Sequence, residues 1–479
     1  MKIAVIIARM LVGSLFIVSG LIKANDSLGF SYKLEEYFAE SALNMPWLIP
    51  ASLVLAIFIA MIEIVLGFAV LFAGKMKLTL GALIALLLFF AWLTYFTASC
   101  NDAQEAAMLA GKSFNKTCVN DCGCFGDALR DTIGRSLTPW ESFTKDIILL
   151  VLTLIIFVGG RNASFNSWRD DKIMLPLGLL GVAGFSFFFS WWLPIFFTLF
   201  VYGLYLLVKY YRPLIAEWGI AGIIASLCLL FSYYTLQHLP VTDFRPYKVG
   251  ANINELMASA KELGKEPTKK AYIYELKHKT TGETKTERSD IYLQNELWKN
   301  WEVVSTGAQV TVSQGYEPKV LSFSAYDPNR DESYSDSRYT ATSWEMLHNP
   351  NYSLVIIAYN LHKLGDVNNT QQDGAAGKSI ILSQGFKNQF NELKKLVSFA
   401  NQKGLKVHAL SNSDRELVEA FKYELKLDLP FYQFDEKELK TIIRSSPGLL
   451  VLKNGVIKGK WHFNDIPEVD AMKSLLKNG

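Results

Sequence analysis

Charged residues are scarce in this chain, and cysteine is scarcer still. Asp, Glu, Lys and Arg make up 19% of the 479 residues, and there are only five cysteines. A soluble chain of this length would carry about 25% charged residues, and a small disulfide-stapled domain would need many more cysteines. The net charge of +3 is too small for the basic surface that nucleic-acid binding requires. The composition therefore excludes a disulfide-rich mini-protein and a nucleic-acid partner, and a hydrophobic content of 50% excludes a disordered chain.

The charge that is present divides the chain into two halves. Residues 1–240 carry 31 charged residues, whereas residues 241–479 carry 62. The first half contains long apolar runs, and a helix needs roughly 20 such residues to cross the ~30 Å hydrocarbon core of a bilayer. A cleaved signal peptide is the alternative for the first run, but that run is long for a signal and Arg9 interrupts it. We predict seven spans, near residues 3–22, 49–74, 78–99 and 143–160, two within 173–208 with a turn at Trp191–Pro194, and one at 215–236.

The basic residues in the short loops predict the orientation of these spans. Cytoplasmic loops carry an excess of Lys and Arg, so one side of the seven-span arrangement is expected to be cytoplasmic, together with the N-terminus. The loop 100–142 and everything after about residue 238 then lie on the opposite side. In a bacterium this predicts a multi-pass inner-membrane protein with a periplasmic C-terminal half. The basic residues on the cytoplasmic side are Lys2, Lys75, Lys77, Arg161, Arg169, Lys172, Lys209 and Arg212.

Residues 241–350 read as a β-rich periplasmic connector, because short runs alternate apolar and polar residues between turn signals. Within it, Ala271–Glu275 and Ile291–Leu293 flank Thr280–Gly282 and predict a β-hairpin. The additional spans of residues 161–240 precede this connector.

Residues 351–479 change to a β/α pattern: strands near 353–359 and 405–410 alternate with helices after Ser383 and after 412–414. A proline, Pro447, then precedes two strands and a terminal helix. This order resembles the thioredoxin/peroxiredoxin-like fold. The resemblance implies that Pro447 is cis and lines a groove for extended peptide, with Arg444 and Ser446 beside it. No cysteine follows Cys228, so we expect this domain to bind a partner and not to exchange thiols itself.

The other four cysteines, Cys100, Cys118, Cys122 and Cys124, lie in the loop 100–142. Three interpretations are open. A Cys₄ metal or iron–sulfur site would have unusual spacing, whereas two structural disulfides suit an oxidising compartment. In the redox interpretation Cys122 and Cys124 form a labile pair, because a disulfide across one residue is geometrically unfavourable, and Cys100 and Cys118 form the second pair. Cys228, inside the last span, is expected to pack as a small apolar residue.

The loop returns to the membrane at Thr138–Glu141, where Thr, Pro and Glu stand in the order of a capping box that begins a helix. The cysteines are therefore expected near the membrane surface, at the depth of a quinone head group. A quinone is the cofactor that this location would allow, although the spacing itself indicates none.

Two charges fall inside predicted spans. Arg9 and Glu63 lie 13 and 14 positions from the outer ends of their spans, or ~20 Å deep at 1.5 Å per residue, so we predict that they pair. Intramembrane charges are costly unless paired and are functional candidates. A helix lock and a proton- or ligand-binding role are both open.

The motif Arg9-x₃-Gly13-x₂-Phe16-x₂-Ser19-Gly20-x₂-Lys23, with Gly29, Glu36-Tyr-Phe38, Glu63 and Cys122-Gly-Cys124-Phe-Gly126, resembles the DoxX/MauE membrane family over residues 1–160. The whole chain is similar to the longer DoxX proteins of Bacteroidota, which append a periplasmic thioredoxin-like domain after a segment like Asp243–Gly250. The resemblance implies a four-span membrane core, about three further spans and a C-terminal α/β domain.

DoxX members are linked to membrane oxidoreductase assemblies, and MauE to maturation of a periplasmic dehydrogenase rich in disulfides. The resemblance therefore implies periplasmic thiol–disulfide chemistry, or maturation of an exported protein, with a periplasmic or envelope protein as partner. The alternative is a non-enzymatic membrane subunit or scaffold, in which the cysteines are structural and the thioredoxin-like domain docks a partner.

Overall fold

The computed structural model describes residues 2–109, 114, 116–119, 123, 125–212, 216–313, 315–372 and 375–478. Contacts within the chain divide it into two compact units. The first contains residues 1–235 and 266–316, and the second contains residues 236–265 and 317–479.

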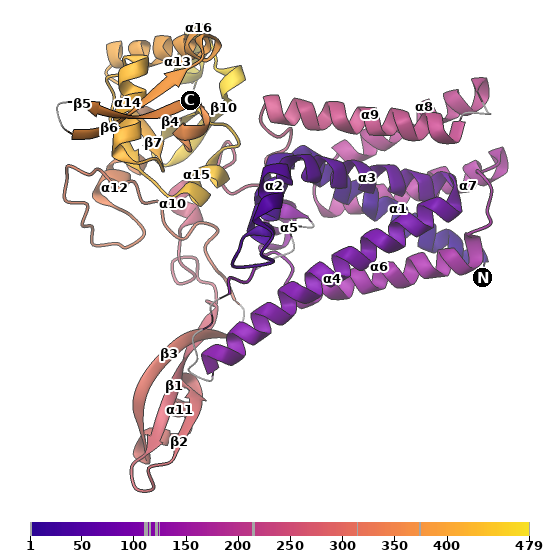
Figure 1. The fold of residues 1–479 in the computed structure, drawn as a ribbon, viewed down its shortest axis with the longest axis horizontal. Coiled ribbons are helices and arrows are strands. Elements are labelled where there is room, and N and C mark those ends of the chain that lie inside the picture. Colours follow the sequence, from indigo (N-terminus) through magenta and orange to yellow (C-terminus); the bar gives the residue numbers. More distant parts are fainter. Residues whose placement is uncertain are drawn as a thin grey trace. The chain divides into compact units, whose positions relative to one another are not determined.

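The first unit is built around long apolar helices that run alongside one another (Figure 1). Among the described residues, seven helices are long and apolar enough to cross a membrane, and each overlaps a predicted span. The chain is therefore a multi-pass membrane protein whose helices require a lipid bilayer. The seven helices are α1 (Lys2–Asn25), α3 (Ser52–Phe72), α4 (Met76–Leu109), α6 (Pro139–Gly160), α7 (Trp168–Phe188), α8 (Leu193–Tyr211) and α9 (Ala216–Gln237).

Three short helices lie in the connections between the long helices, on the side of the bundle that carries the cysteine loop. They are α2 (Ser27–Phe38), the 3₁₀ turn η1 (Pro46–Ala51) and α5 (Gly126–Ile133). Helix α4 is longer than predicted, because residues 101–109 contain Ala, Gln and Glu, which favour helix. Cys100 therefore lies within a helix and not in a loop.

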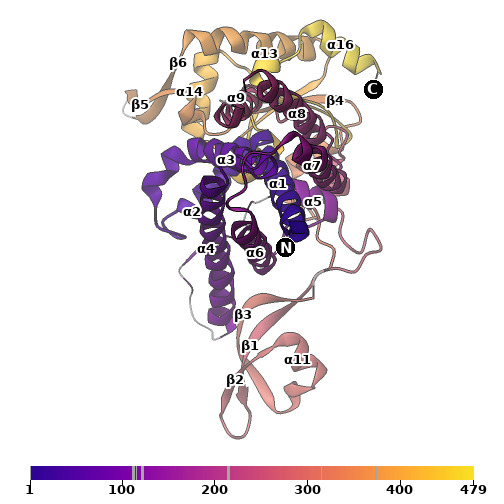
Figure 2. The same ribbon diagram turned by 90° about the vertical axis from the view of Figure 1, so that its right-hand side faces the viewer.

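Helix α1 is the most buried of the seven, and Figure 2 shows it with α3, α6 and α7 around it. Small residues allow its close approach to α3. A Cβ atom on Gly67 would lie 2.8 Å from Gly13 O, and one on Gly20 would lie 2.9 Å from Ala60 O. Small residues at helix–helix contacts let backbones approach closely in membranes. The seven-residue spacing of these small residues on both helices therefore sets their register.

A three-stranded antiparallel sheet with strand order β2-β1-β3 completes the first unit. The predicted turn at Thr280–Gly282 is confirmed, and it joins β1 to β2. The predicted second strand is wrong, because Ile291–Leu293 lies in a helix that begins after Arg288, with Asp290 in its first turn. The elements are β1 (Lys269–His278), β2 (Thr284–Arg288), α11 (Ser289–Gln294), η3 (Leu297–Lys299) and β3 (Trp301–Ser313).

The second unit contains a five-stranded sheet with strand order β10-β9-β4-β7-β8. Strands β4, β7 and β8 are parallel, and β9 pairs antiparallel with both β4 and β10. The buried strand β4 contributes to a core on each face: Leu354 and Ile356 face one cluster, and Val355 and Ile357 face the other. The strands are β4 (Tyr352–Ile357), β7 (Lys406–Ser411), β8 (Phe431–Gln433), β9 (Gly448–Lys453) and β10 (Val456–His462).

Helices cover both faces of this sheet (Figure 1). The helices predicted after Ser383 and after residues 412–414 are confirmed: Ser383 accepts from Phe386 N at the start of α13, and Asp414 accepts from Leu417 N at the start of α14. The helices are α10 (Ile253–Leu256), α12 (Ala341–Leu347), α13 (Gln384–Gln402), α14 (Arg415–Leu425), α15 (Glu436–Ile442) and α16 (Val469–Asn478), with 3₁₀ turns η4 (Leu361–Lys363) and η5 (Phe463–Asp465).

A β-hairpin that the sequence analysis missed is inserted between β4 and α13. It consists of β5 (Gly365–Gln372) and β6 (Ala375–Leu382). Its strands are rich in Asn, Gln, Gly and Ala, so they lack the apolar alternation that predicts a strand from sequence.

Candidate functional site

The cysteine loop is held to the end of helix α4 by a disulfide. Cys100 and Cys118 are joined with a Cα–Cα distance of 5.6 Å, which is the pairing expected for these two cysteines. Both are about nine-tenths buried, at 8% and 9% exposure. Asn101 Nδ2 donates to Val119 O at 3.0 Å, and Val119 packs with Tyr37. These contacts hold residues 118 and 119, which precede the Cys-Gly-Cys motif in the sequence.

Cys122 and Cys124 lie outside the described residues, but their neighbours Gly123 and Phe125 are described. Gly123 has φ +67°, and a Cβ atom there would lie 2.8 Å from Cγ of Lys33. Glycine alone adopts such a conformation freely. The side chain of Lys33, on α2, therefore lies against Gly123, and its Nζ pairs with Glu36 at 2.6 Å.

Phe125 anchors the other flank of the motif. Its ring centroid lies 5.4 Å from that of Phe189 and 5.5 Å from Lys145 Nζ. Lys145 in turn lies 2.7 Å from Asp146 Oδ1, and Thr94 Oγ1 donates to Asp146 Oδ2 at 3.1 Å. Asp146 is completely buried. A buried carboxylate and its lysine thus stand beside the residue that follows Cys124.

The predicted capping box at the start of α6 is confirmed. Thr138 Oγ1 accepts from Glu141 N, and the Glu141 carboxylate accepts from Thr138 N at 2.8 Å. Arg135 donates two hydrogen bonds to the same carboxylate, at 2.7 and 2.8 Å. The helix that carries Lys145 and Asp146 therefore begins at a well-defined residue.

The predicted pair of Arg9 and Glu63 is wrong. Glu63 instead accepts two hydrogen bonds from Lys23 Nζ, at 2.9 and 2.8 Å, and Ser19 Oγ accepts a third at 2.7 Å. The prediction placed both residues at one depth, but the close contact of Gly13 with α3 fixes a different register. Position 9 then lies opposite residues 70 and 71 instead of Glu63.

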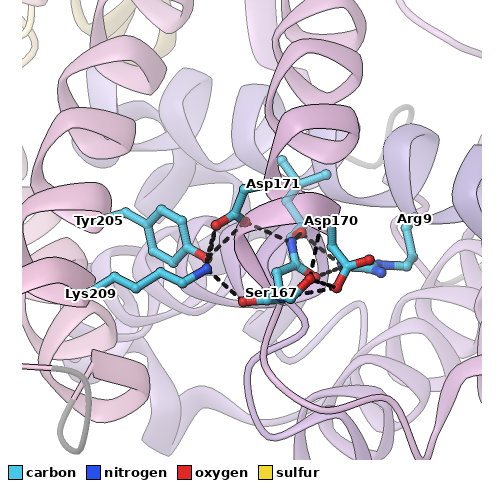
Figure 3. A network of polar contacts seen from close by, with 8 residues as sticks. Arg9, Ser167, Asp170, Asp171, Tyr205 and Lys209 are labelled. Atoms are coloured by element: carbon cyan, nitrogen blue, oxygen red, sulfur yellow. Dashed lines mark hydrogen bonds and ion pairs between the residues drawn. The ribbon is translucent and has the colours of Figure 1, made fainter.

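Arg9 belongs to a separate polar network at the other end of α1 (Figure 3). Its guanidinium donates to Val70 O at 2.9 Å and to Leu71 O at 2.8 Å, carbonyls in the last turn of α3, where the donors of the helix itself run out. It also donates to Asn166 Oδ1 at 2.9 Å, and Asn166 Nδ2 donates to Asp171 Oδ1 at 3.2 Å.

Two residues of α8 complete this network. Tyr205 OH donates to Asp171 Oδ1 at 2.9 Å, and Lys209 Nζ pairs with Asp171 Oδ2. Figure 3 shows Arg9 on one side of the first turn of α7, and Tyr205 and Lys209 on the other. Lys209, predicted among the loop charges, is instead a buried residue of a helix. The network joins α1 and α3 to α7 and α8, which suits a helix lock.

The peptide bond between Ser446 and Pro447 in the second unit is cis, as predicted. Ser446 Oγ donates to Tyr359 O at 2.5 Å, so the proline turn lies against the end of strand β4. Arg444 Nη1 donates to Lys440 O on the preceding helix. These three residues therefore stand beside the carboxyl end of a parallel strand.

Asparagine side chains occupy the chain just after β4. Asn360 N donates to Asn412 Oδ1 at 2.8 Å, and Asn412 Nδ2 donates back to Asn360 Oδ1 at 2.9 Å. Asn360 Nδ2 donates to Glu436 Oε1 at 2.9 Å. This network offers amide and carboxylate groups and no nucleophilic thiol.

Residues 1–104 match the family model described as Methylamine utilisation protein MauE. No curated protein and no solved structure matches the chain. The matched segment contains Arg9, Lys23, Glu63 and Cys100 and ends before Cys118, so only Cys100 of the four predicted redox or structural cysteines falls within the match to MauE.

The sequence did not predict which residues contact the buried charges Arg9 and Glu63. Lys23 enters the prediction only as the last residue of the motif that begins at Arg9, and Asp146 and Asp171 are not among the predicted residues. The signal was present, since an acidic residue in an apolar run needs a cation or hydroxyl within reach. Tyr205 and Lys209 also stand four positions apart, on one face of a helix.

Proposed function

We propose that this chain acts in thiol–disulfide chemistry during maturation of an exported protein. In this proposal Cys122 and Cys124 are the exchanging pair, and the Cys100–Cys118 disulfide holds the loop in place. The observation that carries the proposal is the anchoring of both flanks of the motif: Cys118 on one side by its disulfide, and Phe125 on the other by Phe189 and Lys145. The match of residues 1–104 to MauE is consistent with it.

The exchange itself balances without a further reagent. A thiolate of a partner dithiol attacks the Cys122–Cys124 disulfide and forms a mixed disulfide, and the second partner thiolate then displaces the motif sulfur. Two electrons and two protons pass from the partner to the motif, so the partner gains a disulfide as Cys122 and Cys124 become thiols. The reverse reaction uses the same steps.

We also propose that residues 351–479 form a thioredoxin-like binding module that presents the partner. The strand order β10-β9-β4-β7-β8 and the cis peptide bond before Pro447 support this assignment. Arg444, Ser446 and Pro447 would border its peptide groove. Since residues 241–479 contain no cysteine, the module would bind without reacting.

For orientation, we propose that the cysteine loop and the second unit face the periplasm of a bacterial inner membrane. A disulfide at Cys100–Cys118 is typical of an oxidising compartment. The basic residues Lys75 and Arg161 lie in connections at the ends of α4 and α6 that are away from the cysteine loop. Basic residues in such short connections are typical of the cytoplasmic side.

A membrane scaffold is the second candidate, and the burial of Cys100 and Cys118 favours it, because buried disulfides are structural. Differential alkylation of the full chain separates the two. Under mild reduction, the exchange proposal predicts that Cys122 and Cys124 become accessible while Cys100–Cys118 stays intact, and that Cys122→Ser or Cys124→Ser traps a mixed disulfide. If every cysteine of the loop resists reduction until the chain unfolds, the scaffold function stands instead.

A further inference from the structure

The buried face of helix α8 carries polar side chains along most of its length. Their spacing is four, three and four positions, so they lie on one face of the helix. All of them are buried, and they are Thr198, Tyr202, Tyr205 and Lys209. Polar side chains inside a membrane span are costly unless they find a partner, and they often mark the path of an ion or a proton.

At one end, this polar face of α8 meets an ion pair on α7 (Figure 3). Lys209 Nζ pairs with Asp171 Oδ2, and Tyr205 OH lies 2.9 Å from Asp171 Oδ1 and 3.2 Å from Lys209 Nζ. Further along, the hydroxyl of Tyr202 lies against Gly178 of α7, where an added Cβ atom would be only 2.5 Å from it. These contacts fix the antiparallel register of α7 and α8.

Hydroxyl groups also reach α7 from α1 and from α7 itself. Ser14 Oγ donates to Gly178 O at 3.1 Å, and a Cβ atom on Gly181 would lie 2.3 Å from the Ser14 oxygen. Glycine at these two positions therefore leaves room for hydroxyls against the backbone. Ser186 adds a buried hydroxyl near the turn that leads to α8. Because Asp171 and Ser186 are 15 positions apart, the polar groups extend over ~22 Å of the ~30 Å hydrocarbon core.

Three of these hydroxyls have no hydrogen-bond partner among the described residues: Ser186 Oγ, Thr198 Oγ1 and Tyr202 OH. Other hydroxyls in the bundle do have one. Those of Thr94 and Thr153 donate to the carbonyl four positions earlier, at 2.9 and 2.8 Å, as hydroxyls in helices commonly do. A buried hydroxyl is costly without a hydrogen bond, so such groups are paired with protein or with ordered water. The three hydroxyls are therefore suited to bind water.

The spacing of the hydroxyls suits a file of single water molecules. Successive polar residues on α8 are separated by a rise of ~4.5–6 Å along the helix. This is too far for a direct hydrogen bond, but it is about the length of two hydrogen bonds through one water. Such a water has the two or more polar partners that it needs, and the file ends at Asp171, an ionisable group.

We propose that α7 and α8 enclose a hydrated proton path that leads from Asp171 past Tyr202 and Thr198 to Ser186. This inference goes beyond the proposed function and assigns an activity to the hairpin of α7 and α8. Each oxygen along the path takes up one proton as it releases another, so only O–H bonds form and break, and no oxidant or reductant is required. A difference in pH or electrical potential across the membrane drives the proton.

The test is proton flux into potassium-loaded liposomes that contain the full chain and the pH dye pyranine. Valinomycin in potassium-free buffer makes the interior negative, and the parent chain is expected to acidify it faster than liposomes without protein. Tyr202→Phe and Thr198→Val each remove one hydroxyl at nearly constant volume. Each should slow the flux about threefold to tenfold, the factor that one lost hydrogen bond of ordinary strength corresponds to.

Tyr210→Phe is the matched control, because Tyr210 lies on the same helix but is 70% exposed. This variant should keep the flux of the parent chain. Hydroxyl-radical footprinting of the parent in detergent micelles tests for the water directly, because a buried side chain is labelled only where water lies beside it. Tyr202 should be labelled although it is 6% exposed. Tyr37, whose hydroxyl is paired with Thr97 Oγ1 at 3.1 Å, should not be.

Several results would overturn the proton path. A flux no faster than that of liposomes without protein would do so, and so would equal fluxes in the parent, Tyr202→Phe and Thr198→Val. An equal loss in Tyr210→Phe would show that the effect is not specific to the buried face. Absence of label on Tyr202 would show that no water lies beside its hydroxyl. None of these results bears on thiol exchange in the cysteine loop, so the proposed function is tested separately.

Discussion

Lys23 Nζ lies 2.8 Å from Glu63 Oε2, and the two side chains are only 4% and 2% exposed. All three ammonium protons are used, two by the carboxylate and one by Ser19 Oγ. The rings of Phe30 and Phe90 approach the same ammonium at 5.5 and 5.9 Å. The pair therefore joins α1 to α3 in a buried site, with two aromatic rings packed against the ammonium.

Removal of one partner of this pair should strand a buried charge. Lys23→Met is expected to destabilise the chain by about 3–5 kcal/mol, whereas the double change Lys23→Met with Glu63→Leu should cost much less. Urea unfolding in detergent micelles measures the difference. The pair of Lys75 and Glu217, whose side chains are 54% and 25% exposed, is the control, and its single variants should cost less than those of the buried pair. A double variant as unstable as the two single variants combined would show that the residues act independently.

The approach of α1 to α3 depends on Gly67. A Cβ atom there would lie 2.8 Å from Gly13 O and 2.9 Å from Ile17 Cγ1, so Gly67→Ala is expected to separate the helices and to cost about 1–3 kcal/mol. Gly81→Ala on α4 is the matched control, because nothing lies within 4 Å of that added atom. The control should be neutral or stabilising by up to about 1 kcal/mol. Equal unfolding midpoints for the two variants would contradict this account of the packing.

The sequence predicts local features of this protein better than it predicts the partners of buried charges. The capping box at Thr138 and the N-cap at Asp414 depend on residues within one turn, and both are present. The pairing of Arg9 with Glu63 depends on the register of two helices. That register follows from contacts of Gly13 and Gly20 with α3, which the depth of a residue along its own span cannot reveal.

In the second unit, too, local features are predicted from the sequence, whereas contacts between residues distant in the chain are not. The apolar run of β4 predicts a buried strand. The C-terminal end of β4 lies beside Pro447 because β9, which begins directly after Pro447, pairs antiparallel with β4. The asparagine pair of Asn360 and Asn412 was not predicted, because two residues 52 positions apart meet only after the parallel pairing of β4 with β7 is formed. For the candidate site, the sequence indicates four candidate cysteines, but not that Lys33 lies against Gly123 and Lys145 against Phe125.

His408 should make the second unit sensitive to acid. Burial in strand β7, with a smaller effect from Lys406, lowers the pKa of this imidazole to about 4, and Glu345 opposes the shift weakly. Neither ring nitrogen has a hydrogen-bond partner among the described residues. The unfolded chain takes up a proton near pH 6.5 and the folded chain only near pH 4. Stability is therefore lost as the pH falls through this window, by about 3 kcal/mol at pH 4.

His408→Leu should remove this contribution. Pulse proteolysis of the full chain across a urea series, scored by cleavage within residues 317–479, measures the stability of this unit. The parent should lose more stability than the variant between pH 7 and pH 4, because carboxylates that titrate in the same window are common to both. Parallel losses in the two chains would show that His408 is not the group responsible.

The orientation of the bundle can be tested with reporters at two connections. If all seven long helices cross the bilayer, the connection at Lys75, between α3 and α4, lies on the side opposite to the chain beyond α9. Cytoplasmic connections are rich in Lys and Arg, and Lys75 and Lys77 lie at this one. Alkaline phosphatase folds only where its own disulfides form, so a fusion after Asp243 should be active and a fusion at Lys75 inactive. Green fluorescent protein fused at the same two positions should give the reverse pattern. Phosphatase activity at Lys75 would place the Cys100–Cys118 pair in the reducing compartment, where a stable disulfide is not expected, and both the orientation and the exchange function would have to be abandoned.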